Sequence, residues 1–160
     1  MISLIIPLYN EEENVLVYEK ELLPIIDQIS KEFDEEFEYL FIDDGSTDNT
    51  RDFLEKISQH LPKVKIISHG INKGLGAAMK TGIQNADGEL MIFLDADLTF
   101  RPEYIRNLIS GYHRSDADCV SGSPYIHEDH LKSVAFHRLL ISKTINGTYR
   151  LLLGEPITSI

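Results

Sequence analysis

One short apolar segment, which ends abruptly at two carboxylates, constrains the fold of this chain most. Residues 90–94 are all apolar, and Asp95 and Asp97 follow them with only Ala96 in between. An apolar run of this length that stops at a polar turn is typical of a strand buried on both faces. Because alternate residues of an extended chain point to the same side, we expect both carboxylates to project together from the carboxyl end of this strand.

The rest of the chain alternates between apolar, strand-like runs and amphipathic, helix-like patterns. Strands are predicted over residues 2–8, 37–42, 64–68, 90–94 and 118–122. The helix after the first strand should start near Asn10 and run towards Phe33, with a kink or restart at Pro24 because proline interrupts a helix. This alternation predicts an α/β fold in which helices cover both faces of a mainly parallel sheet.

Polar clusters follow three of the predicted strands. They are Tyr9-Asn10-Glu11, Asp43-Asp44-Gly45 and Asp95-Ala96-Asp97. The carboxyl ends of parallel strands meet at one edge of a sheet, which is where α/β proteins bind ligands. One acidic strand end can arise by chance, whereas three on the same side indicate a functional site.

Asp95 and Asp97 are predicted to bind a metal ion. Two carboxylates this close repel each other unless a cation lies beside them. Hard cations such as Mg²⁺ or Mn²⁺ prefer oxygen ligands and often share them with the phosphates of a substrate. Asp43 and Asp44 leave two interpretations open, since such residues either form a turn and helix cap or accept hydrogen bonds from a base or ribose.

Two further groups of residues allow both a functional and a structural interpretation. Lys73 and the glycine-rich residues after it can hold a diphosphate at a helix amino terminus, or they can let that helix pack closely on the sheet. Residues 130–153 form an amphipathic helical pattern. Its basic residues, which include Arg138 and Lys143, fit either an anionic acceptor or a solvated face. Its apolar residues fit a core or a homodimer contact, and a membrane-surface role is the more specific alternative.

Composition narrows the class of protein and its compartment. The net charge of −11 over 160 residues argues against nucleic-acid binding, which depends on basic surface. The single cysteine, Cys119, excludes an internal disulfide and fits a reducing compartment. The amino terminus lacks the basic and long apolar regions of a signal peptide. We therefore expect a soluble, cytoplasmic protein.

The same residues resemble a known family. The motifs that carry the resemblance, in the order of that family, are residues 6–12 (IPLYNEE), 43–48 (DDGSTD), 72–74 (NKG) with Ala77, Ala78 and Gly82, and 95–97 (DAD). They are similar to those of glycosyltransferase family 2, which has the Rossmann-like GT-A fold. Within it the chain looks most like the dolichyl-phosphate mannosyltransferase type, which moves a sugar from a nucleoside-diphosphate sugar to a polyprenyl phosphate.

The resemblance implies roles for individual positions. The nucleotide would be bound by Pro7, Tyr9, Glu11, Asp43, Asp44, Lys73 and Asp95. Asp95 and Asp97 would be the catalytic residues that hold Mg²⁺ or Mn²⁺ on the diphosphate, and Arg138 and Lys143 would meet the acceptor. A lipid-phosphate acceptor would bring the protein to the cytoplasmic face of a membrane.

The chain also departs from the family pattern. Polyprenyl-phosphate members often have Gly-Ser-Arg where this chain has Gly122-Ser123-Pro124, which weakens the assignment of an acceptor-phosphate contact there. The family usually continues beyond the point at which this chain stops. We therefore expect residues 1–160 to form a single nucleotide-sugar-binding domain that is incomplete at its carboxyl end.

Two alternatives stand beside an active transferase. Residues 95–99 also fit the D-x-D-x-T motif of haloacid-dehalogenase-like phosphatases, in which Asp95 would be the nucleophile. That motif normally opens its fold, however, whereas three predicted strands precede it here. The other alternative is a fragment that binds the donor nucleotide but turns nothing over, because it lacks the rest of the acceptor region.

Overall fold

The computed structural model describes residues 1–122. The chain divides after His113 into two units, and the first, Met1–His113, contains the sheet. In chain order the elements are β1 (Ile2–Leu8), α1 (Glu12–Val15), α2 (Tyr18–Glu21), α3 (Leu23–Phe33), β2 (Phe37–Asp43), α4 (Thr50–Ser58), β3 (Val64–Ser68), α5 (Leu75–Asn85), β4 (Leu90–Phe93), the 3₁₀-helix η1 (Pro102–Tyr104) and α6 (Ile105–Arg114). The prediction of one domain over residues 1–160 stays a prediction.

The four described strands form a parallel sheet in the order β3-β2-β1-β4. The register pairs Leu8 of β1 with Asp43 of β2, and Ile5 of β1 with Phe93 of β4. The carboxyl ends of β1, β2 and β4 therefore lie at the same edge. The predicted α/β fold with a parallel sheet is confirmed.

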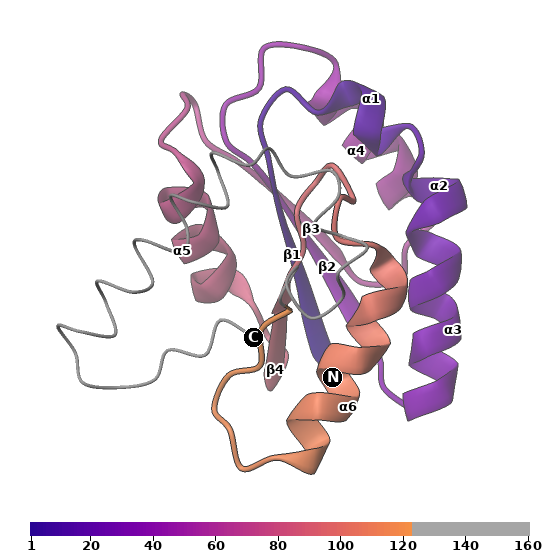
Figure 1. Cartoon of the computed structure of the whole chain (residues 1–160). Helices are drawn as coiled ribbons and strands as arrows, with labels where there is room; N and C mark the ends of the chain where they lie inside the picture. Colours follow the sequence, from indigo (N-terminus) through magenta and orange to yellow (C-terminus); the bar gives the residue numbers. More distant parts are fainter. Residues whose placement is uncertain (123–160) are drawn as a thin grey trace, which may run out of the picture. The chain divides into compact units, whose positions relative to one another are not determined.

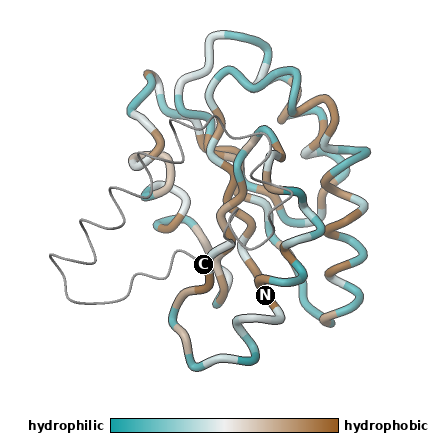
Figure 2. The backbone as a smooth tube through the Cα atoms, viewed as in Figure 1, coloured by the Kyte–Doolittle hydropathy of each residue, from teal (hydrophilic) through white to brown (hydrophobic). Residues whose placement is uncertain are grey.

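Helices cover both faces of this sheet, as Figure 1 shows for α5 on one side and α1 to α4 with α6 on the other. The alternation of β1 explains the two layers. Its even-numbered residues from Ile2 to Leu8 join a large apolar core with residues of α1 to α4 and α6. Ile5 faces the other way and packs with Ala78 of α5. Hydrophobic residues follow the strands, whereas hydrophilic residues dominate the loops at the top of the view (Figure 2).

The segment after β1 differs from the expected kinked helix. It forms three short helices, and α3 begins at Leu23 with Pro24 in its first turn, so the predicted restart is confirmed. Asn10 does not cap the first helix, because its backbone is left-handed (φ 55°) and Glu11 precedes α1 instead. The side-chain oxygen of Asn10 accepts a hydrogen bond from the backbone N–H of Thr47 (2.8 Å).

Two strand predictions need correction. Residues 90–94 are not buried on both faces, because Met91 and Phe93 are exposed. They lie on the α5 side of β4, which is an edge strand in the described part of the sheet, while α5 packs over β1 and β2. Residues 118–122 form no strand in the structure, in keeping with their few apolar side chains.

A cluster of polar groups around the buried Glu38 side chain, at the amino ends of the strands, anchors the turn that leads into β4. The Glu38 carboxylate accepts hydrogen bonds from Ser3 Oγ (2.5 Å) and Asp87 N (2.6 Å) and pairs with Lys65 Nζ at 3.3 Å. Gly88 N donates to Ser3 Oγ (2.8 Å). Burial alone would raise the pKa of Glu38, but these hydrogen bonds and the Lys65 ammonium hold it below its usual range. The cluster ties the α5–β4 turn to β1 and so helps to set where β4 ends.

Candidate functional site

The loops after β1 and β2 are joined by hydrogen bonds from both sides. Asn10 N donates to Ser46 Oγ (3.0 Å), and Thr47 N donates to Asn10 Oδ1 (2.8 Å). Glu11 N donates to Thr50 Oγ1 (2.8 Å) at the start of α4. These bonds hold together two of the three polar clusters that the sequence predicts to form a site.

Gly45 lets a third loop approach. Its φ of 77° is in the left-handed region, which glycine adopts without strain. A Cβ atom at this position would lie 2.5 Å from the carbonyl carbon of Ile71 and 2.6 Å from the backbone nitrogen of Asn72. The Asp-Asp-Gly sequence thus allows the loop after β3 to pack directly against the end of β2.

Asp44 organises that loop. Its carboxylate accepts hydrogen bonds from His69 Nδ1 (2.6 Å), Lys73 N (3.0 Å) and Gly74 N (2.7 Å), and it is buried. His69 Nε2 lies 2.9 Å from Thr81 Oγ1 of α5. Burial alone would raise the pKa of Asp44, but these hydrogen bonds hold it below its ordinary value. Asp44 therefore fixes the backbone of Lys73 and the start of α5.

Asp43 is buried as well, and it connects β2 to β3. Its Oδ1 accepts a hydrogen bond from Ser46 N (2.9 Å), and its Oδ2 accepts one from Ser68 Oγ (3.0 Å). Of the two interpretations that the sequence left open, the structure shows the turn, which Asp43 stabilises. The predicted contact of Asp43 or Asp44 with a nucleotide stays a prediction.

Asp95 and Asp97 lie on a tight turn that continues from β4. Both side chains are exposed, whereas Ala96 between them is buried. Leu98 N donates to the carbonyl of Asp95 (3.2 Å), and Thr99 N donates to Asp97 Oδ1 (2.9 Å). Leu98 has a left-handed backbone (φ 51°). The two carboxylates thus share the exposed side of the turn.

This arrangement fits a cation that takes only part of its ligands from the protein. Within residues 1–122, no group of three or more His, Cys, Asp or Glu side chains forms a metal cage. Mg²⁺ commonly uses one or two carboxylates together with waters and the phosphates of a substrate. The exposed pair Asp95 and Asp97 matches that pattern of ligands, and it does not match a closed structural site.

The remaining predicted nucleotide residues follow the same edge. Pro7 is half-buried near the end of β1, and Tyr9 is exposed immediately after it. Glu11 is half-buried, and its Oε2 accepts a hydrogen bond from Asn14 Nδ2 (2.5 Å). Lys73 is exposed just before α5. Arg138 and Lys143 lie outside the described residues.

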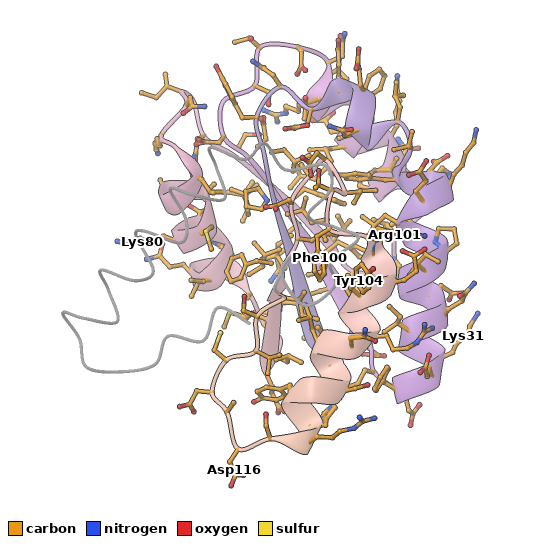
Figure 3. The ribbon with its side chains drawn as sticks, viewed as in Figure 1. Lys31, Lys80, Phe100, Arg101, Tyr104 and Asp116 are labelled. Atoms are coloured by element: carbon orange, nitrogen blue, oxygen red, sulfur yellow. The ribbon has the colours of Figure 1, made fainter. Side chains whose placement is uncertain are left out.

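Aromatic packing supports the chain after the carboxylate turn. Phe100 and Tyr104 lie side by side in Figure 3, with ring centroids 5.3 Å apart. Pro102 begins η1, and Ile105 of α6 is fully buried in the core. The turn with Asp95 and Asp97 is therefore held between β4 and a packed helix start.

Sequence reasoning missed two residues of this region. Tyr18 donates a hydrogen bond from its hydroxyl to the carbonyl of Ala96 (2.8 Å). Its helical spacing with Val15 and Leu22 indicates burial, but no spacing signals a hydrogen bond across the fold. His69 had a usable signal, because it directly follows β3 at the edge where the other polar clusters gather.

Comparison with known proteins gives the family. The sequence profile described as Glycosyl transferase family 2 matches residues 3–159. The chain belongs to glycosyl transferase family 2. This membership favours the glycosyltransferase interpretation of residues 95–99 over the haloacid-dehalogenase-like one.

Two relatives of known type agree with this assignment. The chain is 35% identical over 142 residues to a dolichol-phosphate mannosyltransferase of Pyrococcus furiosus, which covers 89% of this chain and 38% of the relative. It is 35% identical over 158 residues to an undecaprenyl-phosphate 4-deoxy-4-formamido-L-arabinose transferase of Pectobacterium carotovorum, which covers 98% of this chain and 45% of the relative. The chain thus spans less than half the length of these relatives.

Two solved structures share the fold. S. aureus TarS 1-349 matches with a TM-score of 0.56 at 24% identity, over 79% of this chain and 40% of the TarS 1-349 chain. The mannosyltransferase PcManGT of Pyrobaculum calidifontis, solved with GDP-Man and Mn²⁺, matches with a TM-score of 0.53 at 21% identity, over 81% of this chain and 38% of PcManGT. The fold is the GT-A form of the Rossmann-like α/β architecture. Among the described helices, none has the length and apolar character needed to cross a bilayer.

Proposed function

We propose that this chain contains the donor-binding part of a metal-dependent, inverting glycosyltransferase. The enzyme would move a sugar from a nucleoside-diphosphate sugar to a polyprenyl phosphate of the dolichyl type. The observation that carries this proposal is the similarity, over 89% and 98% of the chain, to transferases named for dolichol phosphate and undecaprenyl phosphate. The exposed carboxylates at the end of β4 supply the chemistry such a reaction requires.

In this proposal the nucleotide lies across the carboxyl ends of β1 and β2. Pro7, Tyr9 and Glu11 contact it from the β1 side, and Asp43 and Asp44 line the β2 side. Buried, hydrogen-bonded aspartates suit this role because they keep the loops rigid before the ligand arrives, which lowers the cost of ordering on binding. Lys73 would contact the diphosphate, and the hydrogen bond from its N–H to Asp44 fixes its backbone.

Asp95 and Asp97 would hold Mg²⁺ or Mn²⁺ on the diphosphate. The cation supplies charge neutralisation for the departing nucleoside diphosphate. The two side chains fit this task because they share the exposed side of one turn. The solved complex of a fold relative with GDP-Man and Mn²⁺ supports the choice of metal.

The acceptor half of the proposal depends on residues outside the described part of the chain. Arg138 and Lys143 would contact the anionic acceptor. Because this acceptor is a lipid phosphate, the enzyme would act at the cytoplasmic face of a membrane. A phosphate oxygen is already ionised at neutral pH, so the nucleophile needs no general base. A sugar hydroxyl would need one.

A transfer assay tests this function. The protein is incubated with Mn²⁺ and labelled GDP- or UDP-sugars, together with either a polyprenyl phosphate or the unphosphorylated polyprenol. We expect label in the lipid fraction only with the phosphate. Equal transfer to the polyprenol would contradict the proposed acceptor. Donor binding without transfer by residues 1–160, but transfer by a form extended beyond Ile160, would support the non-catalytic alternative.

A further inference from the structure

We propose that Tyr18 is a positioning residue for the cation site, because its hydroxyl holds the turn that presents Asp95 and Asp97. This inference rests on the proposed function. It assigns a task to a residue that lies 77 positions before Asp95 in the sequence, on a helix that contributes none of the residues proposed to bind the donor.

The Tyr18 side chain is a rigid support. It is fully buried, and its ring stacks on Phe41 of β2 with centroids 6.2 Å apart and an interplanar angle of 21°. Its hydroxyl donates to the carbonyl oxygen of Ala96 at 2.8 Å. Because the ring is fixed in the core, this hydrogen bond fixes the peptide group between Ala96 and Asp97 relative to the sheet.

The turn needs such support from outside itself. Leu98 has φ 51°, a left-handed conformation that costs an ordinary side chain about 1–2 kcal/mol. The hydrogen bonds within the turn are local: Leu98 N donates to the carbonyl of Asp95, and Thr99 N donates to Asp97 Oδ1. Strained backbone of this kind persists only where the surrounding structure over-determines it. The Tyr18 bond anchors the same turn to a distant helix and to the core.

Electrostatics keep the hydroxyl a donor. Burial raises the pKa of Tyr18, and the negative charges of Glu11 and Asp97 raise it further. The hydroxyl therefore stays protonated throughout the pH range in which proteins are normally studied.

Loss of the hydroxyl should weaken binding of the cation and leave the other contacts to the sugar-nucleotide donor unchanged. Tyr18→Phe keeps the ring and its stacking on Phe41, but it leaves the Ala96 carbonyl without this partner. The turn can then rearrange, and the spacing of the two carboxylates is no longer fixed. Contacts to the nucleotide from β1 and β2 do not depend on this bond.

The test measures the Kd of GDP or UDP for the protein by isothermal titration calorimetry, without Mn²⁺ and with Mn²⁺ in excess over nucleotide, and the ratio of the two Kd values gives the gain in affinity from the cation. The variants are Tyr18→Phe and, as a matched control, Tyr39→Phe. Tyr39 is also buried and its ring also packs on Phe41, at 6.3 Å, but it lies on β2. We expect Tyr18→Phe to reduce this gain roughly fivefold to tenfold, and Tyr39→Phe to leave it unchanged.

The stoichiometry of nucleotide binding counts the folded protein, so a partly unfolded variant changes the stoichiometry and does not change the Kd. A gain from Mn²⁺ in Tyr18→Phe as large as in wild type would overturn the inference alone, as would an equal loss of the gain in Tyr39→Phe. If the wild-type protein binds nucleotide without any contribution from Mn²⁺, the proposed metal site fails and the inference fails with it. The first two results reject the inference alone, whereas the third rejects the proposed metal site, so the two failures can be distinguished.

Discussion

Replacement of Asp44 by asparagine should destabilise the protein, because this carboxylate holds the loop after β3. It accepts three hydrogen bonds, from His69 Nδ1, Lys73 N and Gly74 N. Asparagine keeps one acceptor oxygen, and its amide group replaces the oxygen that faces Gly74 N–H. A hydrogen bond to a charged group contributes about 1.5–3 kcal/mol. With one such bond lost and the other two weakened, we expect a loss of about 3 kcal/mol.

Thermal and urea unfolding measure this loss. For a chain of this size, about 3 kcal/mol lowers the Tm by roughly 6–12 °C. Asp27→Asn is the matched control, since Asp27 pairs with Lys31 on an exposed helix face at 2.6 Å, and such pairs contribute only about 0.3–0.5 kcal/mol. A Tm for Asp44→Asn as high as that of the control would refute the structural role of Asp44.

The same variant makes a prediction about pH. Hydrogen bonds hold the pKa of Asp44 in the folded protein below its ordinary value of 3.8. A carboxyl whose folded pKa is lowered adds stability above its unfolded pKa and loses it as the pH falls through the folded value. The stability difference between wild type and Asp44→Asn should therefore be full above about pH 5 and shrink below 3.8. A difference that stays constant down to acid unfolding would contradict this account.

Two further substitutions test how the loops and β4 are held. Glu38→Ala should lower the free energy of unfolding, measured in urea, by about 2–4 kcal/mol. The substitution leaves the donors at Ser3 and Asp87 N without their buried acceptor and breaks the pair with Lys65. A smaller loss would mean that the cluster is not needed to stabilise the fold. Gly45→Ala should cost about 2–4 kcal/mol, since the added Cβ meets a backbone and the φ is left-handed. Gly70→Ala, where a Cβ meets nothing within 4 Å, should be nearly neutral.

The sequence predicted best the elements whose character is local. β1 and β3 have the predicted bounds because short runs rich in apolar residues, bounded by polar or turn residues, define strands. β2 extends one residue further, to Asp43, because Asp43 pairs with Leu8 in the ladder. The helical segment after β1 was harder to predict, since its start depends on how the loop with Asn10 bonds to the next loop.

In the functional site, too, some features follow from local sequence and others depend on how distant elements pack. The convergence of three polar strand ends could be predicted from parallel topology, and the structure confirms that these ends share one edge. The partial exposure of β4 could not be predicted from the sequence, because it depends on which strands α5 covers. The hydrogen bond from Tyr18 to Ala96 joins residues 78 positions apart, and hydrophobic periodicity gives only the burial of Tyr18.

Titration of a nucleoside diphosphate with and without Mn²⁺ tests the central claim most directly. We expect wild-type protein to bind GDP or UDP more tightly with Mn²⁺, and Asp97→Ala to lose that gain. Asp52→Ala, which removes an exposed carboxylate on α4, should retain the gain. If Asp97→Ala binds nucleoside diphosphate with Mn²⁺ as tightly as wild type, the carboxylate pair does not hold the cation and the proposed donor site is wrong.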